Sequence, residues 1–312
     1  MLIAGPNLTL DRVLAIDELR PGEVLRFSDA TIAPGGKGVN VARVARAMGS
    51  PAVLVAMAPG RTGWAAVELL GDEGLRVAAV PVGGEVRAAS IVVERGGRIT
   101  VLNEPGPAIT PDDWAAYEAA IDQHLGGHPW LVCIGSTPPG SPPDAYRRLV
   151  RVGRSRGAGT LVDAAGPLLA AALEEGPDLV TPSLAEAEGV LQGTGAQPAA
   201  EGYPADHGRA LRAAATLVDR GAGSALVTVA AGVAVAGSSG HGWVEAPSVA
   251  VRNPIGAGDS LVGGLVGSLE RGEEFRTALR VGIAAAAASV ETDLPGFVDP
   301  GRVRALTPRV KS

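Results

Sequence analysis

Short apolar runs alternate with helical segments along most of this 312-residue chain. A short apolar run bounded by turn residues predicts a buried strand, and apolar residues spaced by three and four predict an amphipathic helix. Strands that alternate with helices build βαβ units, in which the strands run parallel and helices cover both faces. The alternation therefore predicts an α/β fold with a mostly parallel sheet and helices on both faces.

The predicted strands are rich in Val, Leu, Ile and Ala, and they span Leu2–Ala4, Val53–Met57, Val77–Val82, Leu131–Ile134, Thr160–Asp163, Leu179–Thr181 and Leu226–Val229. Helices are predicted near 39–48, 62–73, 112–125, 143–156, 167–175, 184–192, 207–220, 259–271 and 274–291. The polar, glycine-containing segment 193–206 is typical of a surface loop.

Two segments break the alternation, because residues 12–33 and 86–102 contain strand patterns with no helix between them. In the second segment a Gly96-Gly97 turn separates two β-rich stretches, which predicts a hairpin. Together these segments predict a small sheet that stands off the main one as a lid. We expect a single domain over residues 1–312, with the lid strands in these two segments.

Composition narrows the classes of function. The chain is 46% hydrophobic and carries a net charge of −6 with no basic block, which argues against binding to nucleic acid or to a membrane surface. The single cysteine, Cys133, lies within an apolar run and is expected to be buried. No apolar stretch is long enough to span a bilayer, and no leader pattern precedes the first strand. We therefore expect a cytoplasmic protein.

A glycine turn, Gly256-Ala257-Gly258, precedes Asp259 and a long apolar run. This pattern predicts a loop that opens a helix, and the free N–H groups at a helix N-terminus favour an anion. A carboxylate beside an anion site makes sense as a base that takes a proton from a hydroxyl attacking a phosphoryl group. The alternative is that Asp259 only caps the helix, a role that Asp fills well.

A second glycine-lined helix start contains Gly35, Gly36 and Lys37. The helix behind it, Gly38–Gly49, has regular apolar spacing and ends at a glycine suited to the C′ position. Lys37 and Lys311 are the only lysines of the chain, so a lysine among glycines indicates a site for a compact ammonium. We interpret this turn as a second anion site, although a glycine-lined Lys is also compatible with a simple turn.

In parallel sheets ligands bind at the carboxyl ends of the strands. The strand assignment places several polar residues and loops at the same edge as the glycine turn, namely Asn7, Ser136, Asp163, Ser183 and Ala230. Two anion sites at one sheet edge, one of them with a carboxylate base, suit a kinase with a phosphorylated acceptor.

Four motifs resemble those of the PfkB/ribokinase-like carbohydrate kinase family, in the branch that contains 1-phosphofructokinase and tagatose-6-phosphate kinase. They are Pro6–Asp11, Gly35–Arg43, Asn103–Pro107 and Asn253–Ser260. The resemblance runs nearly end to end. It implies a ribokinase-like, doubly wound fold with a lid, and phosphorylation of a sugar by ATP with Mg²⁺.

The resemblance also implies roles for individual residues. Asp259 would be the general base, and the amides of Gly256, Ala257 and Gly258 would form the anion hole. The acceptor would be held by Asp11, Gly35, Gly36, Lys37, Asn40, Arg87 and Ser136. The nucleotide would contact Ser183, Thr228, Ala230, Gly232 and Gly258, and Glu186 would hold Mg²⁺ through water. Two copies would pair through the lid.

The chain departs from the family pattern around the nucleotide and, at an acceptor-binding position, in the lid. Thr181-Pro182-Ser183 stands where the family usually has Lys-Pro-Asn, the loop Thr228–Gly232 looks shortened, and Val86–Ala89 lacks a customary Asn. Three interpretations remain open. They are a kinase of a ketohexose phosphate (fructose 1-phosphate, fructose 6-phosphate or tagatose 6-phosphate), a kinase of an unphosphorylated sugar or nucleoside, and a weakly active or inactive sugar-phosphate-binding regulatory protein.

Overall fold

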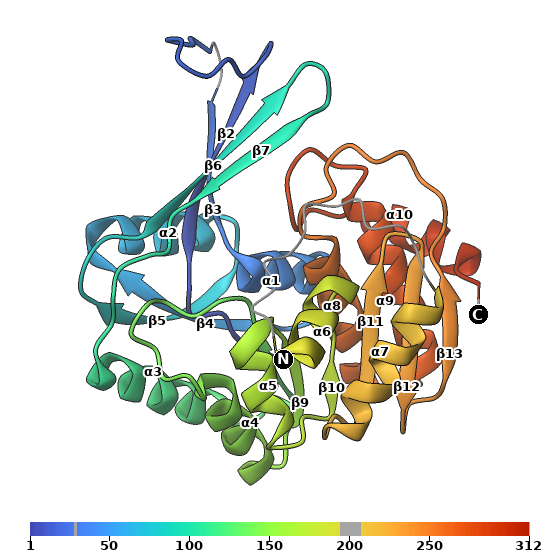
Figure 1. Cartoon of the computed structure of the whole chain (residues 1–312). Coiled ribbons are helices and arrows are strands. Elements are labelled where there is room, and N and C mark those ends of the chain that lie inside the picture. The colour runs from blue at the N-terminus through green and yellow to red at the C-terminus, as the bar shows by residue number, and fades with distance from the viewer. Residues whose placement is uncertain (28–29, 194–206, 312) are drawn as a thin grey trace.

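The computed structural model describes residues 1–27, 30–193 and 207–311. In this part of the chain the main sheet has nine strands in the order β13-β12-β11-β10-β9-β8-β1-β4-β5 (Figure 1). Their bounds are β1 Leu2–Ala4, β4 Val53–Pro59, β5 Arg76–Val82, β8 Trp130–Ile134, β9 Gly159–Asp163, β10 Leu179–Val180, β11 Ser224–Val229, β12 Gly232–Gly237 and β13 Gly242–Glu245. Each predicted strand of the main sheet is confirmed to within two residues.

The sheet is parallel from β5 to β11, and the pairs β11–β12 and β12–β13 are antiparallel. Strands β12 and β13 are absent from the predicted set. The short sequence Gly232–Gly237 contains two glycines and follows β11 after only two residues, Ala230 and Ala231. A hairpin this tight leaves no room for a crossover helix, so the chain must turn back antiparallel.

Helices cover both faces of the main sheet, as predicted. Their bounds are α1 Lys37–Ala47, α2 Gly60–Asp72, α3 Pro111–His124, α4 Ala145–Ser155, α5 Gly166–Leu173, α6 Leu184–Gln192, α7 His207–Asp219, α8 Ala257–Glu270, α9 Phe275–Ser289 and α10 Pro300–Leu306. The short α10 is absent from the predicted set. None of the helices within the described residues is long and apolar enough to cross a membrane.

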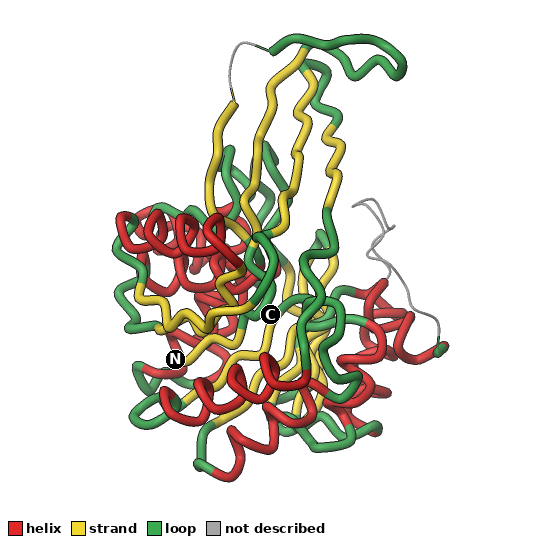
Figure 2. The backbone as a smooth tube through the Cα atoms, turned by 90° about the vertical axis from the view of Figure 1, so that its left-hand side faces the viewer, coloured by secondary structure: helices red, strands yellow, loops and turns green. Residues whose placement is uncertain are grey.

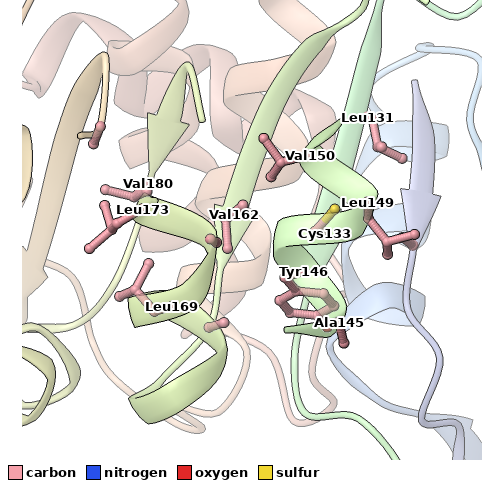
Figure 3. Packing of buried hydrophobic residues seen from close by; sticks show 14 of the residues in the cluster. Leu131, Cys133, Ala145, Tyr146, Leu149, Val150, Val162, Leu169, Leu173 and Val180 are labelled. Carbon is pink, nitrogen blue, oxygen red and sulfur yellow. The ribbon is translucent and has the colours of Figure 1, made fainter. Parts of the chain in front are cut away.

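Alternate residues of each central strand feed two apolar cores. Leu2 and Ala4 of β1 pack into the core that contains α3 to α7, whereas Ile3 packs into the core that contains α1, α8 and α9. This follows from the two-residue period of a strand, which sends successive side chains to opposite faces. Cys133 of β8 is fully buried in the first core beside α4, as predicted (Figure 3).

The predicted lid sheet is confirmed, with strands in the order β3-β2-β6-β7 (Figures 1 and 2). Its strands are β2 Thr9–Ile16, β3 Ala30–Gly35, β6 Arg87–Glu94 and β7 Ile99–Asn103, and β6 and β7 form the expected hairpin. The strands project away from the helix-covered main sheet (Figure 2). Of the predicted surface loop 193–206, Gly193 ends α6 in a left-handed conformation, and residues 194–206 lie outside the described residues. The single-domain assignment stays a prediction.

Candidate active site

The base of the lid meets the carboxyl ends of the main-sheet strands, because the chain passes from β1 through residues 5–8 directly into β2. Contacts between distant segments gather at this edge. Asn7 Nδ2 donates to Ser136 Oγ at 3.0 Å, and Lys37 Nζ donates to Asp163 Oδ1 at 2.7 Å. Thr181 Oγ1 donates to the other oxygen of Asp163 at 3.0 Å. These contacts confirm that the loops after β1, β8 and β10 share one edge with the end of β9.

Asp259 lies in the first turn of α8, behind the glycine turn. The residue that caps this helix is Gly256, in a left-handed conformation with φ of 81°, and no side chain makes a capping hydrogen bond. The Asp259 carboxylate is buried, with 4% of the residue exposed, and its Oδ2 accepts a hydrogen bond from Asn40 Nδ2 at 2.8 Å. The helix-cap interpretation of Asp259 is therefore wrong.

The surroundings of Asp259 make it a weak acid. Burial raises the pKa of the carboxyl, Lys37 lowers it, and the charge of Asp163 raises it. The hydrogen bond from Asn40 lowers the pKa again, and Glu186 raises it, so that the net result is a pKa of about 7. A carboxyl with a pKa near neutrality can both accept and release a proton at neutral pH, which is the property that a general base needs.

Lys37 begins α1, directly after Gly36, which has φ of 110°. Its ammonium lies among carboxylates, 2.7 Å from Asp163 and 3.6 Å from Glu186 Oε1. Burial lowers the pKa of Lys37, but the carboxylates of Asp163, Glu186 and Asp259 outweigh that effect and raise it overall, so the group stays charged. The Lys37 side chain as a whole is 40% exposed.

Gly35, the last residue of strand β3, makes room for the carboxylate of Asp11 on strand β2. A Cβ atom at Gly35 would lie 2.0 Å from Asp11 Oδ2, so any larger residue would displace that side chain. The absence of a side chain at Gly35 therefore leaves space for the Asp11 carboxylate. Gly35 lies beside β2 because it pairs with Thr9 across the lid strands.

Asp11 and Arg87 bring two buried and unsatisfied atoms to the base of the lid. Asp11 Oδ1 and Arg87 Nε are buried without a hydrogen-bond partner, while an Nη1 of Arg87 donates to the Glu104 carbonyl at 3.3 Å. Burial raises the pKa of Asp11 and lowers the pKa of Arg87. Buried polar atoms of this kind usually have partners, so a free acceptor beside a free cationic donor suits a ligand that carries hydroxyl and anionic groups.

On the other side of Lys37, Ser183 and Glu186 form a capping box at the start of α6. Glu186 Oε2 accepts hydrogen bonds from the Ser183 amide and hydroxyl, each at 2.8 Å. Ser183 also pairs with Thr228 through an isolated parallel bridge, which places β11 beside this helix start. The capping role of Ser183 is an outcome that the sequence pattern Ser-x-x-Glu could have predicted.

The predicted nucleotide loop is a tight hairpin. Ala230 and Ala231 form its two-residue turn between β11 and β12. A Cβ at Gly232 would lie 2.2 Å from the Val244 carbonyl oxygen, so the β12–β13 pairing itself requires this glycine. The loop is therefore short, and its glycine has a structural reason to be present.

No group of three or more His, Cys, Asp or Glu side chains within the described residues is arranged to hold a metal ion. Mg²⁺ at phosphoryl-transfer sites commonly uses one or two carboxylates together with substrate phosphates and water. Glu186 and Asp163 supply two carboxylates, and Lys37 is the single ammonium beside them. Their oxygen atoms are therefore suitable ligands for Mg²⁺ or for the water molecules that it binds.

Two residues, Asp163 and Asn7, make contacts at this edge although the sequence predicted no catalytic or binding role for them. Asp163 pairs with both Lys37 and Thr181, and Asn7 contacts Ser136. Asp163 is the last residue of a predicted strand and Asn7 lies three residues after another, so their position at the carboxyl ends was the available signal. Their partners are 126 and 129 residues away, which local patterns do not reveal.

Comparison with known proteins agrees with this geometry. The family model described as "pfkB family carbohydrate kinase" matches residues 7–300. The chain is 30% identical to ATP-dependent 6-phosphofructokinase isozyme 2 of Mycobacterium tuberculosis, over 92% of this chain and 82% of that protein. It is 28% identical to 1-phosphofructokinase of Bacillus subtilis, over 98% of this chain and 96% of that protein.

Among solved structures, phosphofructokinase-2 of Escherichia coli in complex with fructose-6-phosphate is 26% identical, with a TM-score of 0.87 over 99% of this chain and 98% of that one. Ribokinase of Thermotoga maritima is 18% identical with a TM-score of 0.75 over 98% of both chains, and it supports the fold alone. Together with the family match, these similarities place the chain in the pfkB family of carbohydrate kinases, and the protein is a sugar kinase.

Proposed function

We propose that this kinase transfers the γ-phosphoryl group of ATP to a hydroxyl of a ketohexose phosphate, with Asp259 as the general base. The observation that carries the proposal is the buried Asp259 carboxyl at the glycine turn, whose pKa is about 7. Fructose 1-phosphate, fructose 6-phosphate and tagatose 6-phosphate are the proposed acceptors. Relatives named 1-phosphofructokinase and 6-phosphofructokinase support this class.

Each part of the site has a task in this reaction. Asp259 takes the proton of the attacking hydroxyl, and the amides of Gly256, Ala257 and Gly258 stabilise the charge of the transferring phosphoryl group. The Ala257 amide makes only a long bond of 3.4 Å to the Pro254 carbonyl, which a phosphoryl oxygen can replace. Mg²⁺, held through water by Glu186 with Asp163 nearby, would supply positive charge to the phosphates.

The acceptor lies at the base of the lid. Asp11 Oδ1 accepts a hydrogen bond from a sugar hydroxyl, and Asn40, Gly35, Gly36 and Ser136 line the same region. Arg87 and Lys37 bind the phosphate that the acceptor already carries. The unpartnered, buried Nε of Arg87 favours a phosphorylated acceptor over a neutral sugar or nucleoside, because a buried guanidinium nitrogen is costly to leave without an acceptor.

The nucleotide lies on the far side of Lys37, next to Ser183, Thr228, Ala230 and Gly232. Ser183 already satisfies its hydroxyl in the capping box, and the Ala230-Ala231 turn offers no polar side chain. A nucleotide site with few side-chain hydrogen-bond donors favours weak affinity for ATP, even though Asp259 and the glycine turn are present. This observation keeps a weakly active, sugar-phosphate-binding protein as the second candidate.

One assay separates the candidates. Purified protein is mixed with Mg-ATP and a panel of sugars, nucleosides and ketohexose phosphates, and ADP formation is measured. We expect turnover that depends on a ketohexose phosphate. Turnover with an unphosphorylated sugar or nucleoside alone supports the alternative kinase. Sugar-phosphate binding in calorimetry without turnover supports the regulatory protein and contradicts the proposal.

The pKa of Asp259 sets the expected pH dependence. Because the base works in its ionised form, kcat/KM should fall about tenfold for each pH unit below pH 7 and level off above it. The profile is measured under saturating Mg-ATP, with a buffer series of constant ionic strength. A profile that stays flat down to about pH 5 would show that a carboxyl of ordinary pKa, or no carboxyl at all, limits the reaction.

We propose further that two copies associate through the lid. The lid has two open edge strands, β3 and β7, which carry exposed Ile32 and Leu102, 56% and 61% exposed. Exposed edges with apolar side chains favour pairing with another chain. One solved relative is the tetrameric inhibited form of phosphofructokinase-2 from Escherichia coli.

Replacing Leu102 with Lys should therefore shift the protein toward monomers, as measured by sedimentation velocity at several protein concentrations. The matched control is Leu69→Lys on the outer face of α2, which introduces the same charge at a leucine that is 42% exposed. Equal sedimentation of the two variants and the unchanged protein argues against the lid interface.

A further inference from the structure

Asn40 and Asp259 are 219 residues apart in the sequence but form a buried contact in the site. Asn40 Nδ2 donates to Asp259 Oδ2 at 2.8 Å, and only 6% and 4% of the two residues is exposed. We propose that Asn40 is a positioning residue for Asp259, which holds one carboxylate oxygen so that the other can receive the acceptor proton. The inference rests on the proposed function, in which Asp259 is the base.

Two glycines enclose the Asn40 side chain. A Cβ at Gly296 would lie 2.7 Å from Asn40 Cα and 2.8 Å from its Oδ1, and a Cβ at Gly256 would lie 3.2 Å from its Nδ2. Both glycines have positive φ, 76° and 81°, which other residues rarely adopt. The backbone therefore packs directly against the amide and leaves it little freedom to rotate away from Asp259.

The loop that contains Gly296 is fastened at both ends. At one end, Asn253 Nδ2 donates to the Asp293 carbonyl at 2.9 Å. At the other end, the Phe297 ring lies against the Arg43 guanidinium, 4.8 Å from the ring centre, one helical turn beyond Asn40 on α1. Arg43 is itself held by Glu73 through two hydrogen bonds of 2.6 and 2.7 Å. These contacts hold in place the loop whose Gly296 packs against Asn40.

The charges around Asp259 explain why a neutral donor at this position matters. Lys37 of α1 faces it as a cation, whereas Asp163 at the end of β9 and Glu186 of α6 face it as anions. A hydrogen bond to the ionised carboxylate favours that form, so Asn40 lowers the pKa of Asp259 against the effects of burial and of the two anions. Asn40 thus acts on both the direction and the proton affinity of the carboxylate.

A residue that only binds the sugar and a residue that positions the base have different kinetic signatures. Loss of a sugar ligand raises KM and leaves the pH profile in place. Loss of a positioning residue lowers kcat and moves the acidic limb of the profile to higher pH, because the base loses its hydrogen-bond donor. The two roles can therefore be separated by experiment.

The test measures kcat, KM for the acceptor and kcat/KM from about pH 5 to about pH 9 for Asn40→Ala and Asn40→Asp. We expect kcat to fall by about 10- to 100-fold in Asn40→Ala, with an acidic limb about one pH unit higher. KM should change by less than about threefold. Asn40→Asp should move the limb further, because it places a second carboxyl against the first.

Gly296→Ala is the second variant, since it leaves Asn40 in place but presses on it. It should shift the limb in the same direction. Val44→Ala is the matched control, because Val44 is fully buried on the same helix and packs against Gly263 of α8. It should lower thermal stability without moving the limb. Titration of the ¹³C-labelled Asp259 carboxyl by NMR gives the pKa in the free protein and needs no turnover.

A raised KM with an unmoved limb and an unmoved NMR titration would assign Asn40 to sugar binding alone and overturn the inference. The proposed function fails in a different way, namely if Asp259→Asn keeps its activity. If Asp259→Asn is inactive but the pKa of Asp259 is unchanged in the Asn40 and Gly296 variants, the positioning role of Asn40 is refuted and Asp259 remains the base.

Discussion

Replacing Asp259 with Asn is expected to lower kcat by about 10²- to 10⁴-fold, the range that a general base typically contributes. The amide cannot accept the proton of the attacking hydroxyl, while the glycine turn and the acceptor site stay intact. KM for the acceptor should change little, because Asp259 acts mainly in the transition state. The measurement is steady-state ADP formation with a ketohexose phosphate and Mg-ATP.

The substitution should preserve the fold. Asn has nearly the shape of Asp, its side-chain oxygen can still accept from Asn40 Nδ2, and a buried neutral amide avoids the desolvation that raises the pKa of Asp259. Asp178→Asn is the matched control, since Asp178 accepts from the Thr160 amide and hydroxyl, both at 2.8 Å, before strand β10. It should lower stability and leave kcat unchanged. Full activity of Asp259→Asn would remove the base from the mechanism.

Replacing Lys37 with Met is expected to raise KM for phosphorylated acceptors by about 10- to 100-fold, the loss typical of a charge-assisted hydrogen bond. An ammonium has three donors. In the present structure one donates to Asp163 at 2.7 Å, and Glu186 lies further away at 3.6 Å, so a donor remains for a phosphate oxygen. KM for an unphosphorylated sugar should not rise to the same extent.

The same variant should also move the acidic limb of kcat/KM to higher pH, since Lys37 is the cation that lowers the pKa of Asp259. Lys37→Arg is the control that keeps the charge but replaces a compact ammonium with a planar fork, and it should keep the limb while affinity falls. If Lys37→Met has unchanged KM for every phosphorylated acceptor, Lys37 serves only the carboxylates of Asp163 and Glu186.

The main sheet and its helices were predictable because their signals are local. Strand β1 matched the predicted Leu2–Ala4, and α6 matched the predicted 184–192. Apolar spacing reports directly which faces of a strand or helix are buried. The antiparallel pair β12 and β13 was not predicted, since β12 contains glycines at both ends and its partner follows after a short turn.

The candidate site was predictable in its residues but not in their partners. Glycine turns before helices identified Asp259 and Lys37, and the resemblance to the kinase family identified Asp11. The pairing of Lys37 with Asp163 and the burial of Arg87 Nε depend on segments that lie far apart in the sequence and meet only in the folded chain. The spacing of residues along the sequence does not predict contacts between such distant segments.

The amino-acid sequence by itself determined the α/β class, the lid strands and the two helix starts that favour anions. The strands and helices follow from the spacing of apolar residues, and the two helix starts follow from the glycines that directly precede them in the chain. Tertiary structure alone decided the state of Asp259. Its hydrogen bond comes from Asn40, 219 residues away, and its pKa of about 7 comes from burial and from charges on three other segments. A carboxyl becomes a base at neutral pH through its surroundings, and only folding assembles them.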